Sequence, residues 1–163
     1  MAELALALNG DSAYAPPSHV VENLTDDLAH RSVAGAPHTI YGEVWHAAYW
    51  QQVTLDWVRG VETPCPAHND MSFPTDDQAR AESWAALCRR FLAGADAAAA
   101  IANGEGTETV VVCPSPPGKP ARRMTVREQL ESLAAHNAYH LGRVVLLRQL
   151  LGSWPPPSGG FTW

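Results

Sequence analysis

Proline and glycine divide the chain into four stretches, each with apolar residues at helical spacing. Residues three and four positions apart lie on one face of a helix, so this spacing predicts helices that bury one side. The stretches cover residues 18–31, 39–59, 75–102 and 125–151. Because the apolar side of each helix must be covered by another, we predict an all-α fold, a four-helix bundle.

Residues at the ends of these stretches match the signals that begin and end helices. Thr75 with Gln78, and Thr125 with Glu128, have the spacing of a capping box. In this motif each side chain binds a backbone N–H that the helix start leaves free. Gly60 follows the second stretch, where a residue without a Cβ ends a helix at low cost. These signals predict helix starts at both threonines and a helix end before Gly60.

The connections on either side of the third stretch are long for a bundle. Residues 61–74 are polar and broken by proline, and a β-branched run at 107–113 precedes a proline-rich turn. That run predicts a short strand, which can form a β-hairpin with 122–124 just before the last helix. Connections of this length favour crossovers over tight turns. No shift in composition divides the chain, so we expect a single domain over 1–163.

The charge of the chain restricts its partners. The formal net charge is −6 and the pI is near 5.5. Binding to nucleic acid or to an anionic membrane requires clustered Lys and Arg. The nearest approach is Arg122, Arg123 and Arg127, which we interpret as the solvated start of a helix. We therefore expect neither nucleic acid nor membrane as the main partner.

No segment has the features of a membrane span or a secretion signal. The opening MAELALALNGDSA contains Glu3, has no basic region and has too short an apolar run. No stretch approaches the roughly 20 apolar residues of a membrane span. Cys65, Cys88 and Cys113 are widely spaced and match no disulfide or metal pattern. We expect a cytoplasmic protein with reduced thiols.

Two of the seven histidines, His136 and His140, are four residues apart in the last stretch. At this spacing two helical residues lie one above the other, so both imidazoles can reach one ion. They share a stripe with Leu133, Val144 and Leu147, which predicts that they face the core. A buried imidazole needs a hydrogen bond or a ligand, and a metal ion is a suitable one. The spacing alone leaves open a second interpretation, two partly exposed histidines on a solvated face.

A third ligand must come from another helix, and His46 is the candidate. It lies in the middle of 39–59 among apolar residues. Asn137 stands where the HExxH zinc proteases carry a glutamate, so the general base of a metalloprotease is absent. The other histidines lie in loops or near helix ends, and we interpret them as surface residues: His19, His30, His38 and His68.

The chain resembles the DinB/YfiT-like superfamily in two segments. These are VWHAAYWQQV in the second stretch and AHNAYHLGRVVLLRQLLGSWPPPSGGFTW at the end, and the resemblance covers nearly the whole sequence. It implies an up-down-down-up order of helices, one divalent metal ion on His46, His136 and His140, and a homodimer. The superfamily includes transferases and isomerases that use low-molecular-weight thiols, so the resemblance does not imply one reaction. We also expect Trp154 and Trp163 to hold the tail against the bundle.

Three neutral imidazoles leave at least one position on the ion for water or substrate, which is typical of catalytic sites. Nitrogen ligands suit Zn, Ni, Fe or Cu, and the ion would activate a water or a thiol. Glu43, one turn before His46, is either a hydrogen-bond partner of a ligand or a surface carboxylate. Four side chains near the ligands are candidates for a substrate pocket, although the aromatic ones also fit plain core: Tyr49, Trp50, Tyr139 and Arg143.

The sequence supports three functional interpretations. The first is a metal-dependent hydrolase or thiol-dependent transferase that acts on a small molecule, and it predicts a cavity beside the metal. The second is a non-catalytic bundle that metal stabilises and that binds a ligand or partner, and it predicts a closed site. The third is a metal or stress sensor, which ranks last because the chain has no basic face for DNA.

Overall fold

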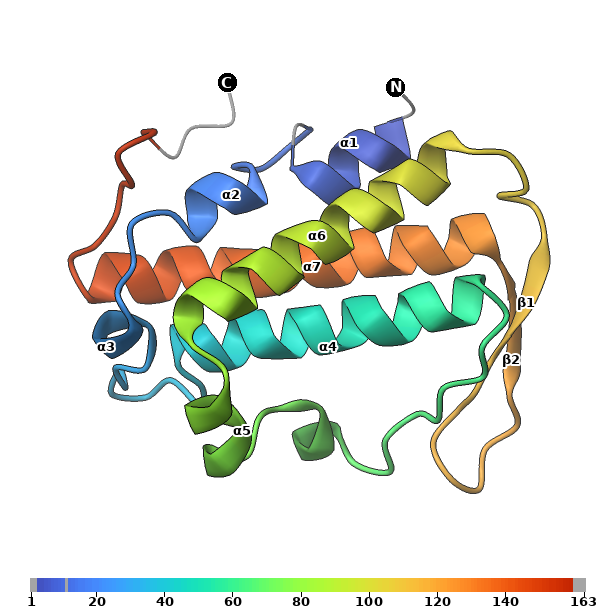
Figure 1. The fold of residues 1–163 in the computed structure, drawn as a ribbon, viewed down its shortest axis with the longest axis horizontal. Helices are drawn as coiled ribbons and strands as arrows, with labels where there is room; N and C mark the ends of the chain where they lie inside the picture. The colour runs from blue at the N-terminus through green and yellow to red at the C-terminus, as the bar shows by residue number, and fades with distance from the viewer. Residues whose placement is uncertain (1–2, 11, 160–163) are drawn as a thin grey trace.

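The computed structural model describes residues 3–10 and 12–159, and these form a bundle built on three long helices. The long helices are α4 (Ile40–Val58), α6 (Trp84–Asn103) and α7 (Val126–Leu150). Two short helices, α1 (Glu3–Asn9) and α2 (Pro17–Val20), follow one another along the remaining side (Figure 1). The prediction of an all-α four-helix bundle is confirmed, with its first helix in two pieces.

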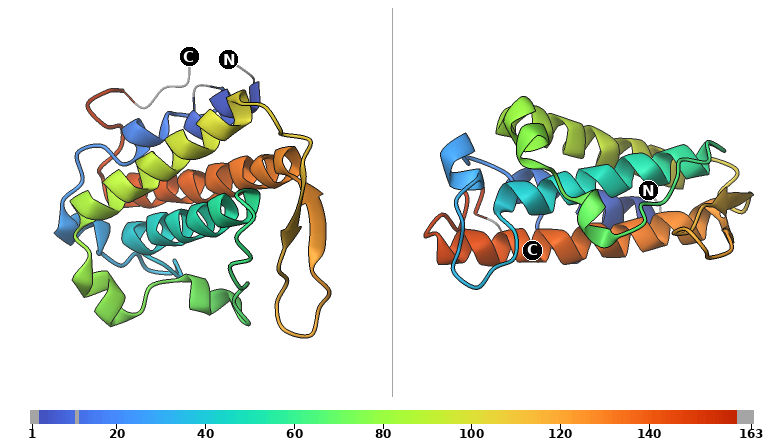
Figure 2. Two further views of the ribbon diagram at one scale, coloured as in Figure 1. Left: turned by 45° about the vertical axis from the view of Figure 1, so that its right-hand side comes forward. Right: turned by 90° about the horizontal axis from the view of Figure 1, so that it is seen from below.

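The helices run in the predicted up-down-down-up order. The chain runs one way through α1 and α2, the opposite way through both α4 and α6, and back again through α7 (Figures 1 and 2). Because α4 and α6 are parallel, the chain between them must return along the bundle. This crossover contains a 3₁₀ turn (Asn69–Ser72) and helix α5 (Asp76–Ala81). The 3₁₀ turn of this crossover packs beside α4.

The prediction of one helix over 18–31 is wrong. This region holds the end of α2 and a second single turn, α3 (Asp26–Ala29). Between them Asn23 has a φ of 53°, a left-handed conformation that a helix cannot contain. Thr25 then starts α3, because its side chain accepts a hydrogen bond from the backbone N–H of Leu28. The cap and the turn therefore outweigh the apolar spacing.

Helix α1 provides the missing length of the first bundle helix, and sequence reasoning did not predict it. Its side chains Ala5 and Leu8 are fully buried against the rest of the bundle. A seven-residue helix has little intrinsic stability, so its packing on α6 and α7 must hold it in place. Such tertiary stabilisation leaves only a weak signal in the local sequence.

The predicted helix over 75–102 is divided at Glu82 and Ser83. Glu82 has an extended backbone, and the Ser83 side chain caps α6 by accepting from the N–H of Ala86. Asp26 of α3 accepts a hydrogen bond at 2.7 Å from the backbone N–H of Trp84, the first residue of α6. The capping box predicted at Thr75 is confirmed, and it begins the short helix α5 rather than one long helix.

The hairpin predicted before the last helix is confirmed. Strand β1 (Val110–Cys113) pairs antiparallel with β2 (Arg122–Thr125). Val111 and Cys113 are buried and face the bundle, whereas the alternate residues of β1 face outward. Thr125 ends β2 and also caps α7 through the predicted capping box with Glu128. The hairpin is therefore attached directly to the helix that carries the histidine pair.

The interior contains two apolar clusters with a polar layer between them. One cluster includes Phe91 and Val144, and the other includes Trp57 and Leu130. Between the clusters, α4 and α7 carry buried polar side chains, among them Gln51, Asn137 and His140. A bundle core without function would be filled with apolar side chains here, because buried polar groups are costly. The polar layer is therefore the candidate location of a functional site.

The C-terminal tail is held by the buried Arg148 of α7. Its guanidinium donates to the backbone carbonyls of Val20 and Ser153 and lies 5.5 Å from the centre of the Trp154 ring. Trp163, the other tryptophan expected to hold the tail, lies outside the described residues.

No helix in the described ranges is long and apolar enough to cross a membrane. Cys65, Cys88 and Cys113 are free thiols.

Candidate metal centre

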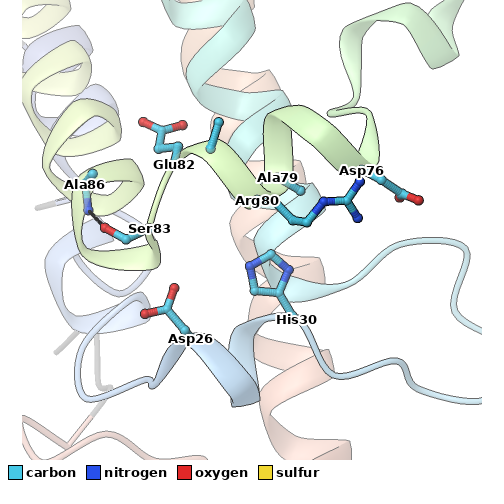
Figure 3. Close-up of a pocket in the computed structure, with 9 residues that line it drawn as sticks. Asp26, His30, Asp76, Ala79, Arg80, Glu82, Ser83 and Ala86 are labelled. Carbon is cyan, nitrogen blue, oxygen red and sulfur yellow. Dashed lines mark hydrogen bonds between the residues drawn. The ribbon is translucent and has the colours of Figure 1, made fainter.

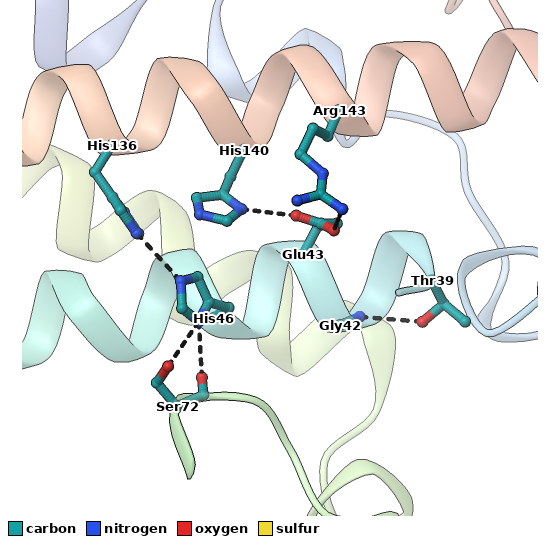
Figure 4. Close-up of polar contacts among 8 residues, drawn as sticks. All are labelled: Thr39, Gly42, Glu43, His46, Ser72, His136, His140 and Arg143. Carbon is teal, nitrogen blue, oxygen red and sulfur yellow. Dashed lines mark hydrogen bonds and ion pairs between the residues drawn. The ribbon is translucent and has the colours of Figure 1, made fainter. Parts of the chain in front are cut away.

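Three imidazoles from two helices meet in the polar layer. His46 extends from α4, and His136 and His140 extend toward it from α7 (Figure 4). One ring nitrogen of each histidine lies within 4.8 Å of those of the other two. The Nε2 atoms of His46 and His136 are 3.2 Å apart. Three nitrogen donors are thus within reach of one point between α4 and α7.

The crossover fixes the orientation and the protonation of His46. Its Nδ1 lies 3.0 Å from both the carbonyl oxygen and the Oγ of Ser72. The Ser72 hydroxyl donates its own hydrogen to the carbonyl of Asn69. Both Ser72 oxygens therefore act as acceptors, so Nδ1 of His46 must carry the hydrogen. The lone pair is then on Nε2, which points toward the other two histidines.

A buried carboxylate fixes the second ring in the same way. Oε2 of Glu43 lies 2.6 Å from Nδ1 of His140, and the Glu43 side chain has no solvent exposure. A carboxylate only accepts, so His140 donates from Nδ1 and keeps its lone pair on Nε2. Arg143 lies 2.9 Å from the other Glu43 oxygen (Figure 4). This guanidinium compensates the buried negative charge.

His136 is the least constrained of the three rings. Its Nδ1 is buried and has no hydrogen-bond partner among residues 3–10 and 12–159. Its Nε2 faces Nε2 of His46, whose lone pair is directed toward it. Without a cation, His136 can donate from Nε2 to His46; with a cation, the same nitrogen supplies a lone pair. His136 can therefore change its tautomer when an ion binds.

Burial keeps two of these rings neutral. Loss of hydration, reinforced by the neighbouring His140, lowers the pKa of His46 to about 4. Loss of hydration, together with His140 and His46, lowers the pKa of His136 to about 3. A neutral imidazole is the form that binds metal. Both rings are therefore in the ligand form throughout the neutral pH range.

The geometry fits a divalent transition-metal ion. With metal–nitrogen bonds of 2.0–2.1 Å, two ligands of a tetrahedral site are about 3.3 Å apart. The separation of 3.2 Å between the Nε2 atoms of His46 and His136 is close to that value. Lone pairs directed toward one another at this distance repel unless a proton or a cation lies between them. The residues present therefore form a cluster that could hold a metal ion.

The chain also matches a known family along most of its length. The model of the DinB superfamily matches residues 15–144, a range that includes α4, α6 and all three histidines. The chain belongs to the DinB superfamily. No curated protein and no solved structure gives a significant match.

In this DinB-superfamily chain the crossover covers one side of the three histidines. Phe73, next to Ser72, stacks on His46 with 4.1 Å between ring centres. His38 stacks in turn on the Phe73 ring, with 3.7 Å between ring centres. The rings of Phe73 and His38 therefore cover this face of His46, which is buried, and water cannot approach it freely from the crossover side.

The other side of the site opens into a cavity of about 200 Å³ between α4 and α7. His136 lies at one end of it and is only partly buried. The walls come from α4, α7 and the first residue of β2: Trp50, Thr54, Trp57, Arg122, Gln129, Ser132 and Leu133. A small molecule in this cavity would contact a member of the histidine cluster directly.

The candidate pocket residues from the sequence lie in different places. Trp50 lines the cavity beside His136, whereas Tyr49 packs against the rings of Trp45 and Trp50. Tyr139 is 62% exposed and packs edge-on against His140. Arg143 lies beside Glu43 and above the Tyr139 ring. Of these four side chains, the cavity wall includes Trp50 alone.

Three residues at the site had no signal strong enough for sequence reasoning. Ser72 and Phe73 lie in the proline-broken loop before α5, with no regular spacing relative to His46. Arg122 was interpreted as part of a solvated helix start, although it lies on β2 and lines the cavity. The length of the crossover was visible in the sequence, but its path across His46 was not.

A wider hollow of about 950 Å³ lies among α3, α5 and the start of α6; His30 lines it, but none of the three clustered histidines does (Figure 3). Several of its polar groups already have structural partners. Asp26 caps α6 at Trp84, and Ser83 accepts from the N–H of Ala86. Glu82 holds Arg90 through both carboxylate oxygens. This hollow is therefore explained by helix capping and ion pairing.

Proposed function

We propose that this DinB-superfamily chain is a metal-dependent enzyme that acts on a small molecule. The metal ligands in this proposal are His46, His136 and His140, and the substrate occupies the cavity that begins at His136. The ion is divalent Zn, Ni, Fe or Cu, since all of these accept imidazole nitrogen. The nucleophile is water or a low-molecular-weight thiol.

One observation carries this proposal: the histidine cluster is covered on one side and open on the other. Phe73 and Ser72 cover His46, whereas His136 lines a cavity. Structural metal sites use four protein ligands and have no free position, whereas catalytic sites keep a position open. Three protein ligands beside a cavity match the second arrangement.

The surrounding residues would hold the ligands in place before any substrate binds. Ser72 and Glu43 each accept a hydrogen bond from the ring nitrogen that faces away from the cluster. Such partners fix the orientation of a ligand ring and raise its basicity. Arg143 prevents Glu43 from being an uncompensated buried charge. When bound, the ion supplies Lewis acidity, which lowers the pKa of a water or thiol and polarises a carbonyl.

The proposal is tested by turnover with and without metal. Protein loaded with each candidate metal is assayed for ester hydrolysis and for conjugation of small thiols to an aryl halide. We expect activity that chelation removes, that metal restores, and that His136→Ala lacks. His68→Ala is the matched control, since His68 is exposed and its side chain caps nothing. Metal that raises the melting temperature without turnover of either kind would instead support a non-catalytic, metal-stabilised bundle.

We further propose that the chain forms a homodimer through the outer face of α7. Three large apolar side chains on this face are more than half exposed: Tyr139, Leu146 and Leu150. They are separated by seven and four residues, so they lie along one face of the helix. Light scattering should give twice the monomer mass, and Leu146→Glu should give the monomer mass. A monomeric wild-type protein at micromolar concentration would refute the dimer.

A further inference from the structure

Among the residues that the structure describes, one charged side chain lines the cavity beside His136, and it comes from the hairpin. Arg122 lies at the start of β2, opposite Cys113 of β1. Paired residues of an antiparallel hairpin point to the same face, and successive residues point to opposite faces. Cys113 is fully buried toward the bundle. The register therefore places Arg122 on the side of β2 that faces the bundle and Arg123 on the outer side, although both side chains are exposed to solvent.

The charge of Arg122 has no counter-ion among residues 3–10 and 12–159. No Asp or Glu within the described ranges forms an ion pair with it, although Arg127, five residues later, pairs with Glu108. Arg122 lies close enough to the thiols of Cys65 and Cys113 to act on them electrostatically. Burial raises the pKa of both thiols, so they stay protonated and neutral at neutral pH. An arginine that lines a cavity and has no ion-pair partner is free to bind an anion there.

The other polar groups of the cavity wall are compatible with an anionic ligand. No carboxylate lines the cavity among the residues that the structure describes. Thr54 and Ser132 carry hydroxyl groups that can donate. The side-chain oxygen of Gln129 accepts a hydrogen bond from the Cys113 thiol at 3.5 Å. The amide nitrogen of Gln129 is then the group that can donate to a ligand in the cavity. The polar lining is therefore rich in donors.

The cavity also has an apolar wall and a defined length. Trp50 and Trp57 pack edge-to-face, with 6.2 Å between ring centres, and both line the cavity. Gln129 and His136 mark its extent along α7, and seven helical residues span about 10 Å. A volume of about 200 Å³ is small for a ligand pocket. These dimensions suit a compact molecule with a flat apolar part.

We propose that the substrate is a small carboxylate, held by Arg122 at its anionic end. Its apolar part lies against Trp50 and Trp57, and its reacting end lies beside His136. This inference rests on the proposed function, since it assigns the substrate class of the same site. Arg122 acts as a specificity residue in it, because it binds a part of the substrate away from the metal ligands.

The test measures binding rather than turnover, with benzoate and its neutral counterpart benzamide as probes. Each is titrated into the full chain, as purified and after chelation, with the tryptophan indole signals followed by NMR. Arg122→Gln is compared with Arg123→Gln, which removes the same charge from the adjacent, outward-facing position. Chelation removes direct coordination of the carboxylate by metal as an explanation, and thermal melting verifies that both variants are folded.

We expect benzoate to bind more tightly than benzamide in both forms of the protein. Arg122→Gln should weaken benzoate binding roughly tenfold, the effect of losing one charged hydrogen-bond partner, and should leave benzamide unchanged. Arg123→Gln should leave both affinities unchanged. Equal binding of benzoate by both variants and the wild type, or no benzoate binding at millimolar concentration, would overturn the assignment.

This assay separates the inference from the proposed function. If the protein binds benzoate through Arg122 but turns over no substrate, the carboxylate site is supported and the enzymatic proposal is refuted. If the protein shows metal-dependent turnover but its Arg122→Gln variant binds benzoate normally, the enzymatic proposal is supported and the carboxylate site is refuted.

Discussion

Glu43 offers the sharpest test of whether the three histidines are held in position for a metal ion. Its carboxylate is fully buried, 2.6 Å from Nδ1 of His140 and 2.9 Å from Arg143. The substitution Glu43→Gln keeps the size of the side chain and an oxygen that can accept from His140. It removes the negative charge, and with it the increase in the basicity of the ring.

The expected loss of affinity follows from this geometry. Partners of metal-binding histidines typically contribute about 10–100-fold in metal affinity. Because glutamine still accepts a hydrogen bond and loses only its charge-assisted strength, we expect a loss near the lower limit, about tenfold or 1.4 kcal/mol. The metal-free protein should keep its fold, since Arg143 is 30% exposed and can turn to solvent when its partner becomes neutral.

The measurement is Zn²⁺ affinity by competition with a chromophoric chelator, together with the melting temperature of the metal-free protein. Glu82→Gln is the matched control, because it breaks a carboxylate–arginine pair with Arg90 that touches no histidine. Zn²⁺ binding as tight in Glu43→Gln as in wild type would refute the role of Glu43. An equal loss in Glu82→Gln would show that the effect is general rather than local.

Three further predictions concern stability. Gly142→Ala should stabilise the protein by about 0.5–1 kcal/mol in chemical unfolding, since its added Cβ meets nothing within 4 Å. Gly94→Ala is the control and should show no such gain, because its Cβ would lie 2.4 Å from Oε1 of the buried Gln51. Arg148→Met should destabilise the protein by about 2–3 kcal/mol, since backbone carbonyls lose their donor, and a change below 0.5 kcal/mol would contradict this role. Burial raises the pKa of Tyr41 to about 12, whereas tyrosine in the unfolded chain ionises near pH 10. The free energy of unfolding should therefore fall as pH rises from 10 to 12, and it should fall less steeply in Tyr41→Phe.

The parts of the fold that follow local rules could be predicted from the sequence. Capping boxes at Thr75 and Thr125 mark helix starts because one side chain and one backbone group three residues apart decide them. The pair His136 and His140 could be recognised because helical geometry fixes how residues four apart lie. His46 was selected by its apolar neighbours, and the structure places it opposite the pair.

The parts that depend on distant segments could not be predicted. The division of the third stretch at Ser83 relies on Asp26, 58 residues away, to satisfy the N–H of Trp84. Ser72 reaches His46 only because parallel α4 and α6 force a crossover over the site. The pairing register of the hairpin places Arg122 on the cavity side of β2, and a shift of one residue would have placed it on the outer side.

The proposal that His46, His136 and His140 share one metal ion is decided by the metal content of the protein. Elemental analysis of the purified protein is compared with that of the three single His→Ala variants and the His68→Ala control. We expect one divalent transition-metal ion per chain in the wild type and the control, and a large loss of metal in each of the three variants. A wild-type protein that binds no such ion, or site variants that retain it fully, would refute the shared metal site.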